Sequence, residues 1–257
     1  MIKLSKLALI SAVVLGGLYS TTVSASANTI NGKADVEFLP ADPTKPVDPT
    51  DPEDPDPKPV KPVDPEDPTP PVYPGGALRL NHIPTFQFGK NNIVSGDGNF
   101  NAYFETVIDE ETNAKTKKAS YVEVADETGS SKGWTVTVNS DGVFKSAKGN
   151  INAGITLTNA SVRGILGMEN KPEVAPTTQE TIQIGYESLG NAEVMKADAG
   201  KGYNKWQVRW GHSDTAIKGD GDENRNPAVS LFVPKGQQVM ADAKYTAKVV
   251  WTLQQGV

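Results

Sequence analysis

The 257-residue chain contains no cysteine and only two histidines. Without a thiol it has no disulfide, no lipid-modified N-terminal cysteine and no cysteine nucleophile. Nucleophilic catalysis needs a base beside an orienting group, whereas His82 and His212 stand singly in segments that we interpret as loops. Two isolated histidines also cannot form a zinc site of ordinary spacing. We therefore expect no catalytic residue, no metal and no cofactor, and a fold held together by packing alone.

The chain also lacks a hydrophobic run of membrane length. Its one marked apolar run, residues 7–18, follows Lys3 and Lys6 and precedes Ala25-Ser26-Ala27. A membrane-spanning helix needs about 20 residues, whereas a charged start, a short apolar stretch and an A-x-A site are typical of a secretory signal peptide. We predict that residues 1–27 are a signal peptide, that residues 28–38 form a short mature N-terminus, and that no part inserts directly into the membrane.

An excess of positive charge is absent as well, because the formal net charge is −6. Residues 1–38 carry +1 and residues 39–74 carry −6, so residues 75–257 are almost neutral at −1. Such a domain lacks the basic field that dominates nucleic-acid affinity and the polybasic patch that binds anionic lipid. The composition therefore argues against nucleic acid and membrane surfaces as partners.

Proline recurs every two or three residues between positions 40 and 74, with acidic residues, Lys, Thr and Val between. Proline lacks a backbone donor, fixes φ and forces the preceding residue into an extended conformation. We predict that residues 39–74 are a disordered polyproline-II linker that contributes nothing to the core. Its deletion is then expected to leave folding almost unchanged.

From residue 75 onward, short segments of alternating apolar and polar residues are separated by Gly, Asn, Asp and Ser. Such segments are typical of β-strands, and no segment shows a sustained helical period. The predicted strands are 86–88, 122–124, 134–138, 155–158, 182–186, 206–210, 229–233 and 245–253. We predict an all-β fold, a single β-sandwich-like domain over residues 75–257.

Two of these strands carry a Trp followed two residues later by an aliphatic side chain. The first is Trp134-Thr-Val136, and the second is Trp251-Thr-Leu253, which Tyr245 precedes. Early in the domain the chain also has Phe-Gln-Phe-Gly at 86–89, and Asp-Glu-Thr-Gly at 126–129 precedes the first Trp.

This pattern resembles the WxL domain of Gram-positive lactic acid bacteria, enterococci and listeriae. The family has Trp-x-Leu in its first half and Tyr-x-x-x-x-Thr-Trp-x-Leu near its end. In this chain Val136 replaces the first Leu and Val250 the Thr before the second Trp. The resemblance, over residues 75–257, implies a secreted, non-enzymatic protein held on the cell wall without covalent linkage. It implies a cell-wall-binding motif formed by Trp134, Val136, Tyr245, Trp251 and Leu253.

The same resemblance implies peptidoglycan as the main partner and association with a WxL-interacting membrane-anchored protein. An adhesive role toward host matrix or glycans is compatible with it. The main alternative is a wall-active hydrolase, because glycoside cleavage needs two carboxylates about 5 to 10 Å apart. Glu105, Asp109, Glu123 and Asp126 supply carboxylates, but their spacing singles out no pair.

Residues i and i+2 of a strand point to the same face, so each Trp forms one apolar step with its partner. These steps either face the core, on strands that pair with each other, or present an indole platform for sugar rings. Val138 and Val249 continue the same faces and favour the core.

A third stripe, Trp206, Val208 and Trp210, leaves the same two possibilities open. It packs in the core, or it lines a glycan groove together with Tyr203 and His212. Asp220-x-Asp222-x-Asn224 resembles the start of a calcium loop, but Arg225 occupies the position of the required glycine. We interpret that segment as a polar turn.

Overall fold

The computed structural model describes residues 33–42, 44, 47–56, 58–63, 75–219 and 224–256. The predicted signal peptide lies outside these residues, as do most of the calcium-like segment and residues 64–74 of the predicted linker. Residues 1–38 and 39–257 form two units, and the described part of the first, residues 33–38, is exposed and has no regular structure. No described helix is long and apolar enough to cross a membrane.

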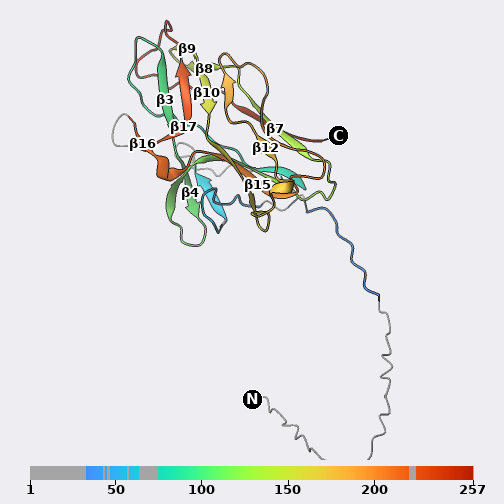
Figure 1. The fold of residues 1–257 in the computed structure, drawn as a ribbon. Helices are drawn as coiled ribbons and strands as arrows, with labels where there is room; N and C mark the ends of the chain where they lie inside the picture. The colour runs from blue at the N-terminus through green and yellow to red at the C-terminus, as the bar shows by residue number, and fades with distance from the viewer. Residues whose placement is uncertain are drawn as a thin grey trace, which may run out of the picture. The chain divides into compact units, whose positions relative to one another are not determined.

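The prediction of an all-β fold is confirmed (Figure 1). Apart from two short 3₁₀ helices, η1 (Pro172–Val174) and η2 (Ser213–Thr215), every regular element described is a strand. The strands are β1 (Val60–Val63), β2 (Leu78–His82), β3 (Gly98–Tyr103), β4 (Glu105–Asp109), β5 (Lys115–Lys118), β6 (Ser120–Asp126), β7 (Trp134–Asn139), β8 (Val143–Ser146), β9 (Gly149–Asn152), β10 (Gly154–Leu157), β11 (Ala160–Ile165), β12 (Thr177–Thr178), β13 (Ile182–Gly185), β14 (Ala192–Ala197), β15 (Asn204–Trp210), β16 (Ile217–Lys218), β17 (Asn224–Val233) and β18 (Val250–Gln255).

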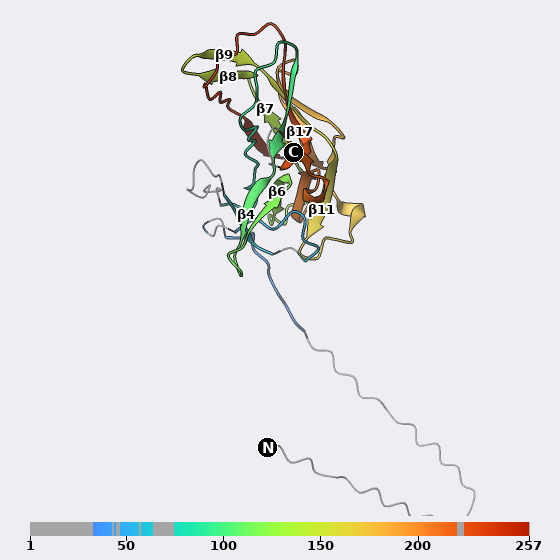
Figure 2. The ribbon, with the colours of Figure 1, turned by 90° about the vertical axis from the view of Figure 1, so that its left-hand side faces the viewer.

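The strands form small antiparallel sheets. Two four-stranded sheets have the orders β11-β15-β6-β2 and β12-β14-β7-β18. A five-stranded sheet has the order β13-β10-β17-β16, with β3 also paired to β17, and β1-β4-β5 form a three-stranded sheet. The β8–β9 hairpin and β4 lie at opposite ends of the domain in both views (Figures 1 and 2).

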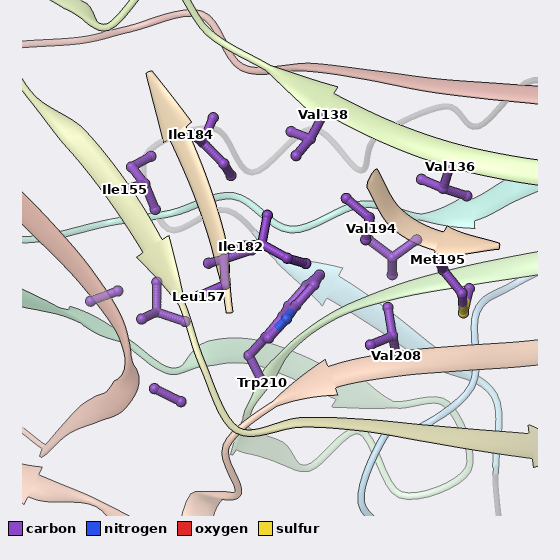
Figure 3. Packing of buried hydrophobic residues seen from close by; sticks show 14 of the residues in the cluster. Val136, Val138, Ile155, Leu157, Ile182, Ile184, Val194, Met195, Val208 and Trp210 are labelled. Atoms are coloured by element: carbon purple, nitrogen blue, oxygen red, sulfur yellow. The ribbon is translucent and has the colours of Figure 1, made fainter. Parts of the chain in front are cut away.

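One hydrophobic core lies between these sheets (Figure 3). Val136 and Val138 of β7 face it from one side, and Val208 and Trp210 of β15 enter it from another. In both strands the buried apolar residues occur at every second position, as the alternation of the sequence predicts. The arrangement is the sandwich-like packing of sheet faces over a shared core.

Strand β6 departs from the simple alternation, because all seven of its residues are buried. Val122 and Val124 face the hydrophobic core, whereas Glu123 between them is 0% exposed. A strand that is buried on both faces must be covered on the side away from the core. The cover comes from the proline-rich segment.

The predicted continuous linker over residues 39–74 is therefore wrong for residues 47–56 and 58–63, which pack on the β domain. Val60 is 1% exposed, and β1 pairs with β4 from Val60↔Asp109 to Val63↔Thr106. Pro62 takes part in this pairing because β1 is an edge strand, where a residue without a backbone donor is tolerated. On the N-terminal side of β1, the buried Thr50 forms hydrogen bonds with Glu123 of β6 and Gln207 of β15.

Two predicted strands also differ from the structure. Residues 86–88 are irregular, although Phe86 and Phe88 pack against the core and the Gln87 carbonyl accepts a hydrogen bond from the Tyr103 amide. The last predicted strand, 245–253, is a strand only from Val250 onward. In both segments, apolar side chains at alternate positions reach the core from an extended backbone that lacks a continuous ladder partner.

Candidate functional site

The two Trp steps lie on neighbouring strands, as the core interpretation predicts. β7 and β18 pair antiparallel, with Trp251 opposite Val138 and Leu253 opposite Val136. The last strand of the domain thus closes directly onto its first Trp strand, and both steps face the same core.

Trp134 is fully buried, and its indole nitrogen donates a hydrogen bond of 2.9 Å to the Gly202 carbonyl. Two glycines make room for this ring and its strand. Gly202 has φ of +71°, and a Cβ there would lie 2.3 Å from the Cβ of Ala197 and 2.8 Å from the indole nitrogen. Gly133 has φ of +73°, and a Cβ there would lie 2.3 Å from the Ala197 carbonyl oxygen. Trp134 therefore occupies a closed slot that presents no indole face to a ligand.

Trp251 is only half-buried. Its ring lies between Trp210 and Phe86, with ring centroids 6.3 Å apart in each pair. Leu253 and Tyr245 are also half-buried and pack against the core, and the Tyr245 hydroxyl accepts a hydrogen bond from the Met240 amide. The core interpretation is confirmed for the Trp134 step, and the second step packs on the same core from its margin.

The third stripe also belongs to the core. Trp206 is 2% exposed and Trp210 is fully buried, and the Trp206 indole donates to the Tyr203 carbonyl at 2.9 Å. For these two indoles the core alternative is confirmed and the glycan-groove alternative is wrong, because neither ring presents a face to solvent. Tyr203 itself is 36% exposed at the start of the stripe.

On the far face of the same sheet lies a buried polar cluster that the sequence did not indicate. The Glu123 carboxylate accepts hydrogen bonds from the amide and hydroxyl of Thr50 and from Gln207 and Asn81, at 2.6 to 2.9 Å. The Lys205 ammonium lies 3.5 Å from it. A buried carboxylate is tolerated only when its oxygens are satisfied in this way. The proline-rich segment is thus bonded to the sheet through a polar anchor.

A second anchor involves Glu53 of the same segment. Its carboxylate accepts hydrogen bonds from the amides of Ala119 and Ser213 and from the Ser213 hydroxyl. The Arg163 guanidinium donates to the Asp51 and Asp54 carbonyls at 2.7 and 2.6 Å. The segment is therefore attached to several strands and loops that are distant in sequence.

His82 is not in a loop, contrary to the sequence prediction. It ends β2, is buried, stacks on Tyr121 with ring centroids 4.0 Å apart, and has Nε2 2.8 Å from a Glu105 oxygen. Burial raises the pKa of Glu105, an effect that the neighbouring His82 opposes. His212 does lie in a loop, where its Nδ1 caps η2 by accepting a hydrogen bond from the Asp214 amide. The two carboxylates Glu105 and Glu123 are thus both enclosed and engaged within the domain.

The fold and these contacts define an all-β domain whose Trp motifs are structural parts of its core. The chain matches the family model of the WxL domain, described as surface cell wall-binding, over residues 25–256, and it belongs to that family. No curated protein matches it, and no solved structure matches it. The protein is therefore a cell-surface protein with a cell-wall-binding domain. The match begins well before residue 75 and includes the proline-rich segment, in agreement with the packing of residues 47–63 on the domain.

Proposed function

We propose that this protein attaches to the cell wall by non-covalent binding of peptidoglycan, through the outer surface of the folded β domain. The observation that carries the proposal is the WxL family match over residues 25–256. The burial of Trp134, Trp206 and Trp210 supports a division of labour in which the Trp motifs stabilise the fold and other side chains contact the wall. The near-neutral charge of residues 75–257 favours an uncharged polymer over a polyanion.

The experiment is sedimentation of the purified mature chain, beginning near Asn28, with purified peptidoglycan. We expect saturable binding that persists at high salt and is reversed by denaturant without enzymatic digestion. Protein that stays in the supernatant at all peptidoglycan concentrations contradicts the proposal. Release by muramidase alone contradicts the non-covalent part of it.

We further propose that the protein is not an enzyme. Glu105 is paired with His82 and Glu123 is enclosed by four donors, so the support for a carboxylate hydrolase from these two residues is weak. Prolonged incubation with peptidoglycan is expected to release no soluble fragments. Release of reducing ends or of stem peptides contradicts this proposal.

Association with a WxL-interacting membrane-anchored protein, and adhesion to host matrix or glycans, stay predictions of the family resemblance. Co-purification from envelope extracts tests the first, and a screen of immobilised glycans and matrix proteins tests the second. A positive result in either test is compatible with wall attachment, because partner binding and adhesion would each use a surface other than the peptidoglycan site.

A further inference from the structure

Two shallow concavities lie on either side of the loop that joins β13 to β14. Their volumes are about 460 Å³ and about 450 Å³. Glu187 and Leu189 of this loop line the first, and Ser188 lines the second. The loop is therefore a wall that both concavities share.

The backbone around this loop is held tightly. The Tyr186 amide donates to the Ala153 carbonyl at 3.2 Å, and the Ser188 amide donates to the Gly185 carbonyl at 2.8 Å. A Cβ at Gly185 would lie 2.9 Å from the Cα of Gly142, so the two turns touch through bare backbone. Because this backbone is already fixed by hydrogen bonds and packing, binding of a ligand would cost less conformational entropy.

The side chains that line the concavities suit a polyhydroxylated ligand. The first combines the half-buried ring of Tyr186 with Asp141 and Asn152, and the second is lined by Gln183, Thr181 and Glu193. An aromatic face beside carboxylate, amide and hydroxyl groups provides both a stacking surface and acceptors and donors for sugar hydroxyl and acetamido groups. Among the described residues that line either concavity, none is a lysine or an arginine. This electrostatic setting disfavours an anionic polymer.

Two further features indicate a surface that is available for binding. Leu189, on the wall between the concavities, is 75% exposed. In β13, Ile182 and Ile184 point into the core (Figure 3), so Gln183 between them projects outward. Neither Leu189 nor Gln183 is needed for the hydrophobic core, and both are free to serve contact with a ligand.

We propose that the two concavities are adjoining subsites for consecutive sugar units of a peptidoglycan glycan strand, with the β13–β14 loop between them. The inference rests on the proposed function and assigns its binding site. Stacking on Tyr186, hydrogen bonds with the amides of Asn152 and Gln183, and acceptance of a sugar hydroxyl by the Glu193 carboxylate select uncharged, acetamido-bearing sugars. A repeating polymer fits two neighbouring concavities better than a single small ligand does.

The test measures sedimentation with purified peptidoglycan, and binding of soluble N-acetylglucosamine oligomers by calorimetry, for the mature chain and three variants. The double variant Gln183→Ala/Leu189→Ser alters the second concavity and the wall, and Asn152→Ala alters the first. The matched control Gln254→Ala removes another exposed strand glutamine, from β18. We expect each site variant to keep the parental melting temperature and to weaken binding about tenfold, as the loss of one or two ligand hydrogen bonds implies, while the control binds like the parent.

Three outcomes overturn this inference and leave the proposed function standing: parental binding by both site variants, loss of binding when anionic polymers are stripped from the wall, or loss of binding when stem peptides are removed from the glycan. A parent chain that fails to bind peptidoglycan at all contradicts the proposed function itself. A folded site variant with weakened binding, together with parental binding by Gln254→Ala, supports the assignment.

Discussion

At the scale of single residues, Trp134 and Trp251 occupy equivalent positions in the sequence motif but different environments. Trp134 is enclosed between two glycines with positive φ and has its indole hydrogen bond satisfied within the domain. Trp251 contacts Trp210 and Phe86 at the margin of the core and keeps part of its surface in solvent. The two residues therefore contribute unequally to stability.

We expect Trp134→Ala to lower the free energy of unfolding by about 3 to 5 kcal/mol, because it leaves a large cavity and an unpaired carbonyl. Trp251→Ala is expected to lower it by roughly 1 to 3 kcal/mol, since less surface is lost from the interior. Urea denaturation followed by circular dichroism measures both. Equal effects, or a larger effect at Trp251, contradict this account of the two sites.

Glu105 provides a prediction about pH. Its pKa is raised by burial, so the folded state binds the proton more tightly than the unfolded state does. The stability contributed by this group is therefore full below the ordinary pKa of a glutamate, about 4.3, and is lost as the pH rises through the raised value.

Relative to Glu105→Gln, which has no titration at this position, the parent chain should become less stable as the pH is raised from about 4 toward neutrality. The measurement is urea denaturation of both proteins across that range, and the difference between their free energies reports Glu105 together with its contact to His82. A difference that is constant with pH, or that moves in the parent's favour, is inconsistent with the raised pKa.

At the scale of elements, the proline-rich segment is part of the domain. Val60 fills an apolar site, β1 extends the sheet of β4 and β5, and Thr50 satisfies the buried Glu123. The segment covers the face of β6 that points away from the core. Its removal would expose that face to water and take two hydrogen-bond donors, the amide and hydroxyl of Thr50, from the Glu123 carboxylate.

We expect deletion of residues 47–63 to lower the free energy of unfolding by at least about 3 kcal/mol, because the apolar burial of Val60 is lost together with the hydrogen bonds of Thr50 and Glu53. Deletion of residues 33–38, which are all exposed, is the control and should change it by less than about 0.5 kcal/mol. Thermal melting of both shortened proteins checks this. A melting temperature that is unchanged after loss of 47–63 restores the linker interpretation.

Most strands could be predicted from the sequence, since alternation in segments such as 134–138 and 206–210 reports burial of one face directly. The pairing of β7 with β18 belongs to one of the two alternatives that the sequence left open, the one in which both apolar steps face a shared core. The packing of residues 47–63 could not be predicted in the same way. Proline spacing gives no burial period, and the bonds of Thr50 and Glu53 depend on partners about 70 to 160 positions away along the chain.

The polar face of β6 was missed for a related reason. Alternation places Glu123 on the other face of β6 from Val122 and Val124. If that face is assumed to be open to water, the sequence predicts a solvated carboxylate. Only the cover provided by the proline-rich segment buries it. The first concavity beside β13 was equally invisible, because it arises where three separate segments meet, at residues 141–142, 152 and 186–189.

At the scale of the whole molecule, the residues that stabilise the fold differ from those proposed to bind the wall. The Trp motifs that characterise the sequence lie in and at the margin of the core, and in the proposed function the surface of the folded domain contacts the wall. Loss of wall binding in a Trp variant is then a consequence of unfolding. Variants such as Gln183→Ala should show the reverse behaviour, with weakened binding in a protein that stays folded.

The most direct test of this claim is to measure peptidoglycan sedimentation and folded fraction on the same samples of Trp134→Ala over a range of temperatures. We predict that the bound fraction follows the folded fraction, so that the variant binds like the parent at low temperatures where it is folded and loses binding as it melts. A variant that is folded by circular dichroism and yet fails to sediment with peptidoglycan would contradict the account, because Trp134 would then act in recognition itself.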